Sequence, residues 1–453
     1  MKNISFDKYQ RLLDTKSFVR YSGKVTKVVG LTIESEGPET HIGALCHIYG
    51  AKHVGAMSES RTSIVSRQEK PVLAEVVGFR EKHVLLMPIG DMTGIGPGNL
   101  VVAADRDLEV GVGQSLLGRV LDGLGCPMDD KGPVEIETYY PVSNMPPNPM
   151  TRPRIQQILP LGVKCIDGLL TIGKGQRMGI FAGSGVGKST LLGMIARNTK
   201  ADINVIALIG ERGREVRDFL ERDLGEEGLK RSVVVIATSD QPALIRLKGA
   251  LVATAIAEYF RDCGKDVLLL MDSLTRFSMA QREIGLAVGE PPVTRGYTPS
   301  VYAIMPKLLE RSGTSDKGSI TGLYSVLVDG DDMNEPITDT ARGILDGHIA
   351  LSRKLAHRNH YPAIDVLSSI SRVMNDIVED EHKEAANELR RNLAIYGDAE
   401  DLINVGAYVK GSNPSIDKSI ALNEGIKEFL IQGTFERFTC NDSIELLKQA
   451  VQG

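Results

Sequence analysis

The chain has 453 residues, of which 42% are hydrophobic and 25% are charged, and its formal net charge at pH 7 is −5. The length and composition are typical of a globular protein with more than one domain. The negative net charge gives no sign of the excess of basic residues that is usual in proteins that bind nucleic acid. The sequence shows neither the apolar core of a signal peptide nor an apolar run approaching the roughly 20 residues that cross a bilayer, so any membrane contact is expected to be peripheral.

The first predicted domain covers residues 1–104. Residues 5–15 (SFDKYQRLLDT) have the pattern of a short amphipathic helix, and a frayed terminus is the alternative. From residue 19 onward, short runs alternate apolar and polar residues between Gly and Pro turns, which predicts a small antiparallel β-barrel or sandwich. The runs are GKVTKVVGLTIES, LAEVVGF, HVLLMPI and NLVVAAD. The polar stretch 53–71 is expected to be a surface loop of this domain.

The second predicted domain covers residues 105–375 and belongs to the α/β class. Its strands are short, apolar and rich in β-branched residues, and helical segments separate them, which is typical of a parallel sheet covered on both faces. The predicted strands are RMGIFA (177–182), NVIALIG (204–210), SVVVIAT (232–238), VLLLMD (267–272) and YSVLVD (324–329). The Pro-rich stretch 146–155 is expected to be a crossing loop.

The third predicted domain covers residues 376–453 and is helical. The stretch IVEDEHKEAANELRRNLAIYG has helical spacing and mixed charge, and Gly397 is its expected end. The cysteines are scattered along the whole chain without the spacing of metal ligands, so we expect reduced thiols of a cytosolic protein. They are Cys46, Cys126, Cys165, Cys263 and Cys440.

A phosphate-binding loop is predicted in IFAGSGVGKST (180–190), between a strand and a helix. The stretch matches G-x-x-x-x-G-K-[ST] except that Ala182 stands at the first glycine position. Backbone N–H groups of such a loop and the N-terminus of the following helix bind phosphate oxygens. Lys188 would reach the β- and γ-phosphates, and the Ser189 hydroxyl would bind Mg²⁺. The predicted binding residues are Gly183, Ser184, Gly185, Val186, Gly187, Lys188, Ser189 and Thr190.

A strand that ends in aspartate commonly supplies the second partner of the magnesium ion. The predicted strand VLLLMD ends in Asp272, and the carboxyl ends of parallel strands lie beside bound phosphates. We therefore predict a metal-binding role for Asp272, and an N-cap of the following helix is the alternative role.

Many charged residues follow the predicted strand VIALIG directly, in the stretch GERGREVRDFLE. A carboxylate at this position, Glu211, would stand near the γ-phosphate and orient the attacking water for in-line displacement. Arg212 and Arg276 would balance the charge of the phosphates and of Glu211. The alternative is a capping box with surface salt bridges, and that structural role is the one we assign to Glu215 and Asp218.

Five stretches together resemble the flagellar protein export ATPases, which are related to the catalytic subunits of rotary ATP synthases and to the ATPases of type III injectisomes. They are AGSGVGKST, GERGREVRDF, MDSLTRFSMAQREIGLAVGEPP, RGYTPSVYAIMPKLLERSG and DGDDMNEPITDTARGILDGHIALSR. The resemblance spans nearly the whole chain, and the family's phosphate loop also begins with Ala. It implies a RecA-like P-loop domain between a β-barrel and a helical domain, in an ATP hydrolase that energises flagellar type III protein export.

The family forms homohexameric rings with Mg-ATP between subunits. By resemblance, Lys188 and Ser189 hold phosphate and Mg²⁺, Glu211 activates water, and Asp272 completes the metal site through its water shell.

The resemblance further implies an arginine finger that reaches the nucleotide of the neighbouring subunit. Arg372 in LSSISRVM matches it, because Ser369 and Ser371 supply the family's S-x-S-R context. Arg353 in IALSRKLA is the competing candidate, and a structural arginine paired within its own chain is the alternative for Arg372. Tyr361 matches the aromatic residue that stacks on adenine, with a packing role as its alternative.

The partners implied by the resemblance are other copies of the chain, a stator-like regulator, a central stalk protein, the export gate and chaperone–substrate complexes. The loop 289–300 would face the central pore, and the N-terminus would contact the regulator and acidic lipids. No nucleic acid is expected. The implied location is the cytoplasm, peripherally at the inner face of the cytoplasmic membrane.

Several other functions compete with this interpretation. An injectisome ATPase would have the same chemistry and different clients. A rotary ATP synthase subunit would carry an acidic helical lever near its C-terminus, which this chain lacks. A hexameric RNA translocase would need aromatic residues on a basic barrel face, and this region has few: Tyr21, Tyr49 and Phe79. Lys188 and Glu211 disfavour a non-catalytic ring subunit.

Overall fold

The computed structural model describes residues 21–50, 71–104, 107–328, 330 and 332–452. By internal contacts the chain divides into two compact units, Met1–Leu108 with Ile284–Glu290, and Glu109–Glu283 with Pro291–Gly453. None of the described helices combines the length and apolar character that a bilayer-crossing segment requires. The predicted helix 5–15 and nearly all of the predicted loop 53–71 lie outside the described residues.

The first unit contains a closed antiparallel barrel with strand order β1-β2-β5-β4-β3-β6, which decides between the barrel and the sandwich. Residues that alternate along the strands point inward, and Ile33, Ile48 and Leu86 are fully buried in its core. The strands are β1 (Ser22–Val29), β2 (Thr32–Glu36), β3 (Leu45–Tyr49), β4 (Val72–Arg80), β5 (His83–Pro88) and β6 (Leu100–Ala103). The apolar runs predicted all of them except β3.

The second unit is built around a sheet with strand order β17-β16-β10-β15-β13-β11-β12-β8, in which β14 also pairs with β15. The strands from β16 to β8 pair in parallel, whereas β17 and β14 are antiparallel to their neighbours. Their bounds are β8 (Val120–Asp122), β10 (Arg177–Ala182), β11 (Ile203–Ile209), β12 (Ser232–Ala237), β13 (Asp266–Asp272), β14 (Gly313–Thr314), β15 (Ser319–Leu327), β16 (Gly347–Leu351) and β17 (Ile364–Ser371).

The predicted central strands are all present in this sheet, and their residues are largely buried. β15 begins at Ser319, ahead of the predicted start at 324, because polar and glycine residues open it. Four strands of this sheet were not predicted: β8, β14 and β16, which are two to five residues long, and the edge strand β17, which is half-exposed.

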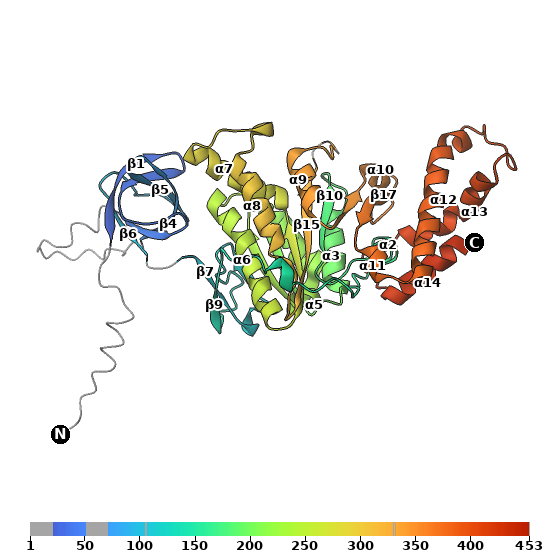
Figure 1. Cartoon of the computed structure of the whole chain (residues 1–453), viewed down its shortest axis with the longest axis horizontal. Coiled ribbons are helices and arrows are strands. Elements are labelled where there is room, and N and C mark those ends of the chain that lie inside the picture. The colour runs from blue at the N-terminus through green and yellow to red at the C-terminus, as the bar shows by residue number, and fades with distance from the viewer. Residues whose placement is uncertain (1–20, 51–70, 105–106, 329, 331, 453) are drawn as a thin grey trace, which may run out of the picture. The chain divides into compact units, whose positions relative to one another are not determined.

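Helices cover both faces of the central sheet (Figure 1). On one face, α3 (Lys188–Asn198) packs with Leu268 and Leu270 of β13 in a single core that also includes α2 (Lys164–Leu169) and the C-terminal helices. On the other face lies α6 (Ala243–Asp262), whose Gly249 lies beside the Ile209 side chain. The arrangement matches the predicted α/β architecture and leaves the carboxyl ends of the strands open for a site.

Shorter elements connect this framework. The hairpin of β7 (Glu109–Val112) and β9 (Thr138–Pro141) forms a separate small sheet. The predicted crossing loop 146–155 contains only one short 3-10 turn, η3 (Pro149–Thr151). The remaining elements are η2 (Gln114–Leu116), α4 (Gly213–Asp218), the π-helical η4 (Phe219–Leu224), α5 (Gly225–Lys230), α7 (Leu274–Val288), η5 (Thr294–Gly296), α8 (Pro299–Glu310), α9 (Pro336–Ile344), α10 (Arg353–His357) and α11 (Met374–Ile377).

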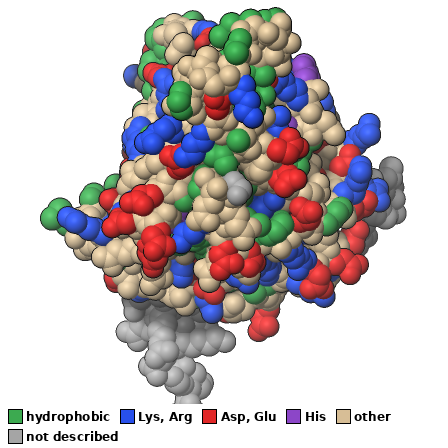
Figure 2. Space-filling view, turned by 90° about the vertical axis from the view of Figure 1, so that its right-hand side faces the viewer, with side chains coloured by type: hydrophobic (Ala, Val, Ile, Leu, Met, Phe, Trp, Pro, Cys, Tyr) green, Lys and Arg blue, Asp and Glu red, His purple; other side chains and the backbone are tan. Residues whose placement is uncertain are grey.

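The C-terminal part is helical as predicted, with α12 (Asp380–Asn404), α13 (Pro414–Leu430) and α14 (Cys440–Gln452). The prediction that the first helix ends at Gly397 is wrong, because α12 continues to Asn404. A glycine destabilises a helix by only about 1 kcal/mol relative to alanine. Beyond Gly397, Ala399 is buried, and this packing favours continuation of the helix. Figure 2 views the molecule from the right-hand side of Figure 1. On the surface that it shows, acidic and basic side chains are interspersed.

Candidate active site

The predicted phosphate loop joins β10 to α3. Gly185 and Gly187 have φ angles of 77° and 86°, so glycine supplies the left-handed backbone that the turn requires. Ala182, by contrast, is the last residue of β10 and is paired with Leu327 and Leu351 on either side. Its position is regular strand, which explains why this loop needs no glycine there.

Lys188 opens α3 and lies between two carboxylates. Its Nζ is 2.5 Å from Asp272 Oδ1 and 3.7 Å from Glu211 Oε1. All three side chains are largely buried, with exposed fractions of 12% for Lys188, 5% for Asp272 and 15% for Glu211. Burial lowers the pKa of Lys188, but the charges of Asp272 and Glu211 outweigh it and the net shift is upward. The lysine is therefore held as a cation in this cluster.

The sheet brings these residues together from distant parts of the sequence. β11 and β13 are parallel neighbours, and Leu208 is paired with Asp272. Glu211 therefore follows β11 at the same edge at which Asp272 ends β13, and the phosphate loop leaves β10 at that edge too. The predicted convergence of Lys188, Glu211 and Asp272 is what the structure contains.

Glu211 has a second acidic neighbour that the sequence analysis left in a structural role. Burial raises the pKa of Glu211 to about 7, the charge of Asp272 adds to the rise, and Lys188 opposes it. A hydrogen bond to the Glu215 carboxyl raises this pKa further, and the same bond lowers the pKa of Glu215. Glu215 lies four residues after Glu211, in the first turn of α4, and that short spacing was the available signal for placing it at the site.

The two arginines predicted to balance charge differ in their surroundings. Arg212 Nη1 donates to Glu215 Oε1 at 2.9 Å, and 80% of the Arg212 side chain is exposed, so its described contact is with Glu215. Arg276 packs against Gly210, because a Cβ there would lie 2.7 Å from Arg276 Cβ. The buried Arg276 Nε has no hydrogen-bond partner among the described residues. A buried N–H donor of this kind, next to Glu211, is suited to an anionic ligand.

The other predicted binding residues line the loop and its entrance. Ser184 and Ser189 are exposed, Val186 is buried, and Thr190 is half-buried. The Tyr361 ring lies beside the loop, 3.4 Å from where a Cβ of Gly187 would be, and 39% of the residue is exposed. An aromatic face next to the phosphate loop is a suitable platform for a base.

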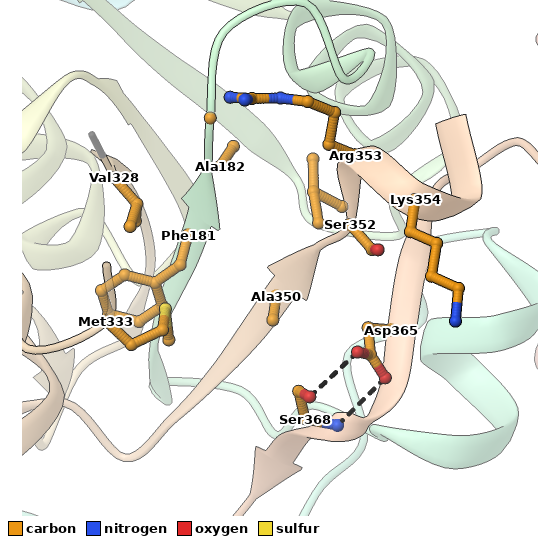
Figure 3. A pocket seen from close by; sticks show the side chains of 12 residues that line it. Phe181, Ala182, Val328, Met333, Ala350, Ser352, Arg353, Lys354, Asp365 and Ser368 are labelled. Carbon is orange, nitrogen blue, oxygen red and sulfur yellow. Dashed lines mark hydrogen bonds between the residues drawn. The ribbon is translucent and has the colours of Figure 1, made fainter. Parts of the chain in front are cut away.

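The two finger candidates occupy different places. Arg353 lines a pocket of about 240 Å³ with Phe181, Ala182 and Asp365. In Figure 3 its side chain extends toward the end of β10, where the phosphate loop of the same chain starts. Arg372 is exposed, directly follows β17 and donates through Nη2 to the Arg342 carbonyl at 3.4 Å. Of the two candidates, Arg372 is therefore the one that is exposed at the edge of the sheet.

The predicted pore-facing loop 289–300 carries η5 and leads into α8 at Pro299. Arg295 in this loop lies 2.7 Å from Asp332. The predicted N-terminal contacts with a regulator and with lipids fall outside the described residues.

Three family models match the chain in order. The model "ATP synthase alpha/beta family, beta-barrel domain" covers residues 25–104, and "ATP synthase alpha/beta family, nucleotide-binding domain" covers residues 162–371. The model "T3SS EscN ATPase C-terminal domain" covers residues 378–449.

Several relatives are similar to this chain over nearly its whole length. The flagellum-specific ATP synthase of Bacillus subtilis is 56% identical over 446 residues, which cover 97% of this chain and 98% of that protein. The flagellum-specific ATP synthase of Treponema pallidum is 53% identical and covers 97% and 95%, respectively. The type 3 secretion system ATPase of Xanthomonas euvesicatoria is 50% identical and covers 97% and 96%.

Solved structures agree with this likeness. The assembled ATPase EscN of the enteropathogenic E. coli type III secretion system has a TM-score of 0.87 and 45% identity, and the match covers 95% of this chain and all of that chain. EscN in complex with its central stalk EscO has a TM-score of 0.85 with the same identity and coverage.

Proposed function

Because the chain belongs to the ATP synthase alpha/beta family and ends in the C-terminal domain of type III secretion ATPases, we propose that it hydrolyses ATP to energise flagellar type III protein export. The observation that carries the ATPase part is the convergence of Lys188, Glu211 and Asp272 where the phosphate loop enters α3. The flagellar part rests on the full-length likeness to flagellum-specific ATP synthases.

In the proposed reaction, Lys188 exchanges its carboxylate partners for the β- and γ-phosphate oxygens of ATP. This exchange removes the positive charge beside Glu211, whose carboxylate then orients the attacking water and accepts its proton. Burial and the charge of Asp272 raise the pKa of Glu211, which makes its carboxylate a stronger base for this proton. Arg276, with its buried Nε next to Gly210, would donate to the phosphate that is cleaved.

The residues at the loop fit a magnesium ion. Ser189 offers a hydroxyl in the first turn of α3, and Asp272 offers a carboxylate at the end of β13. Oxygen donors of this kind, few in number and completed by water and phosphate, are what Mg²⁺ prefers in proteins. When bound, the ion would neutralise charge that develops on the phosphates. Ser189 and Asp272 are the residues we assign to it, Asp272 through the water shell.

The proposed working form is a homohexamer in which Arg372 acts on the nucleotide of the next subunit. EscN, the structural relative, is described as assembled, and Arg372 is exposed at the end of the edge strand β17. A finger supplied in trans raises the hydrolysis rate by orders of magnitude. Tyr361 and residues Gly183–Thr190 would hold the base and the phosphates on the receiving side.

The proposed partners are a central stalk protein, a stator-like regulator, the export gate and chaperone–substrate complexes. The stalk has the firmest support, since the EscN relative is seen with its central stalk EscO. The proposed location is the cytoplasm, at the inner face of the cytoplasmic membrane beside the export gate.

Two experiments test the proposal. The purified chain should hydrolyse ATP in a magnesium-dependent reaction, and absence of this activity at any protein concentration would contradict the ATPase assignment. Deletion of the gene should abolish external flagellar filaments, and complementation should succeed with the wild type but poorly with Glu211→Gln. Normal filaments in the deletion strain, together with ATPase activity, would instead favour an injectisome role, in line with the Xanthomonas relative.

A further inference from the structure

Ser325 is a buried hydroxyl that contacts Asp272. It lies on β15, is fully buried, and its Oγ donates to Asp272 Oδ1 at 2.5 Å. The contact follows from the sheet register: β13 and β15 are parallel, and Met271 is paired with Tyr324. The next residues on the two strands, Asp272 and Ser325, therefore point to the same face, the one on which α3 and the phosphate loop lie.

The same oxygen of Asp272 is shared by two donors. Lys188 Nζ and Ser325 Oγ both lie 2.5 Å from Oδ1, and the hydrogen bonds described for this carboxylate all involve that atom. Oδ1 is thus occupied on the inner side of the site. Oδ2 is left as the oxygen that can face a metal's water shell.

The two donors differ in what happens to them when nucleotide binds. Lys188 is needed at the phosphates, so its bond to Asp272 must break in the proposed reaction. Ser325 lies on β15, which is paired with β10 on one side and β13 on the other. Its hydroxyl therefore stays beside Asp272 when the Lys188 side chain moves. After nucleotide binding, Ser325 is the remaining side-chain donor that holds the Asp272 carboxylate.

The chemical setting argues against a purely structural hydroxyl. On the same face of β15, Leu323 is apolar and fully buried in the core. A buried hydroxyl needs a hydrogen bond, and serines on strands or helices commonly find one on nearby backbone. The bond described for Ser325 goes instead to the carboxylate of Asp272.

We propose that Ser325 is a positioning residue, whose hydroxyl fixes the Asp272 carboxylate so that Oδ2 faces the hydrated magnesium ion once Lys188 has moved to the phosphates. The inference rests on the proposed function of the site. It extends that function to β15, a strand on which the sequence predicts no site residue. Outer-shell partners of this kind typically contribute about 10–100-fold to metal affinity.

The test compares Ser325→Ala with Ser325→Thr, which keeps the hydroxyl, and with Ser312→Ala. Ser312 is an equally buried hydroxyl, bonded to Tyr324 at 2.7 Å and remote from the loop in sequence and role. The readouts are binding of a fluorescent ADP analogue as free Mg²⁺ is varied, the same binding in excess EDTA, and the melting temperature. Steady-state hydrolysis against free Mg²⁺ is measured in parallel.

For Ser325→Ala we expect the half-saturating Mg²⁺ concentration for nucleotide binding to rise about tenfold, with affinity in EDTA unchanged. Ser325→Thr should stay close to wild type, and Ser312→Ala should lower the melting temperature without moving the Mg²⁺ dependence. If folded Ser325→Ala shows the wild-type Mg²⁺ dependence, the inference is wrong. Should Ser325→Ala not fold, Ser325→Cys, a weak donor of similar size, is read by the same criteria. Failure of the wild type to bind the ADP analogue would instead refute the proposed function.

Discussion

Lys188 Nζ and Asp272 Oδ1 lie 2.5 Å apart, so the lysine expected at the phosphates is paired with the acid expected to organise the metal. Glu211 completes the cluster at 3.7 Å from the same nitrogen. The three side chains therefore form one cluster of largely buried ion pairs. Binding of Mg-ATP has to replace these pairs, and the predictions below follow from that exchange.

Lys188→Ala is expected to abolish nucleotide binding and to destabilise the protein. Without the ammonium group, two buried carboxylates face each other unpaired, and breaking such a buried pair costs about 3–5 kcal/mol. Titration with a fluorescent ATP analogue and urea unfolding measure the two effects. The matched control is Lys174→Ala, which removes a lysine paired with Asp266 outside the phosphate loop. Wild-type ATP affinity in Lys188→Ala would contradict the assignment of the loop.

Glu211→Gln is expected to bind ATP and to lose hydrolysis. The amide keeps the size of the side chain but cannot accept the proton of the attacking water, and loss of a general base typically lowers rates about 100–10,000-fold. Single-turnover hydrolysis and analogue binding separate the two effects. Turnover at the wild-type rate would show that Glu211 is not the base and would move attention to Glu215.

The stability of the nucleotide-free protein is expected to depend on Glu211 in a defined pH window. Burial raises the pKa of Glu211 from its ordinary value of 4.5 to about 7, so the folded chain keeps a proton that the unfolded chain releases within that range. Stability from this group is therefore present below the lower value and falls as pH rises toward the upper one, by about 1–3 kcal/mol in all.

The measurement for this window is urea unfolding of wild type and Glu211→Gln at about pH 5 and about pH 8, both without nucleotide. Glu211→Gln should unfold at a higher urea concentration than wild type at the higher pH, and the difference should shrink at the lower pH. Glu226→Gln, at an exposed position in α5, serves as the control. An equal difference at both pH values would rule out burial of the Glu211 charge as the cause.

Arg372→Ala is expected to lower the hydrolysis rate by orders of magnitude while nucleotide still binds. Because the finger acts in trans, subunits of Arg372→Ala mixed with inactive subunits of Lys188→Ala should recover part of the activity, since some interfaces then combine an intact loop with an intact finger. Arg353→Ala subunits should gain nothing from the same mixing, since Arg353 lies beside the loop of its own chain. The reverse outcome would transfer the finger to Arg353.

Removing one partner of the Arg311–Glu258 pair is expected to destabilise the second unit without affecting nucleotide affinity. Arg311 donates to both Glu258 oxygens at 2.8–2.9 Å, and the two side chains are 2% and 0% exposed. Glu258→Gln leaves the guanidinium buried with a neutral partner, and loss of such a pair costs about 3–5 kcal/mol. Urea unfolding measures the loss, and an unchanged midpoint would mean that the site relaxes to admit water.

Local chemistry along the chain was enough to predict the parts whose residues are adjacent in sequence. The phosphate loop, the charged end of β11 and the aspartate at the end of β13 were predicted because glycine geometry, helix start and strand end each depend on a few consecutive residues. Apolar runs predicted β10, β11, β12, β13 and β15 for the same reason, while β8, β14, β16, β17 and the continuation of α12 beyond Gly397 were not predicted. There, packing partners elsewhere in the chain outweigh local propensity.

The linear sequence was sufficient to name the groups to which we assign the chemistry: a lysine and a serine on a glycine-rich turn, and two carboxylates at strand ends. How these groups pair with one another follows from the three-dimensional fold. The choice of neighbours in the sheet places Asp272 between Lys188 and Ser325, although 84 and 53 residues, respectively, separate them along the chain. Hydrogen bonds and ion pairs between strands depend on strand order and register, and these are set by long-range packing rather than by residue spacing.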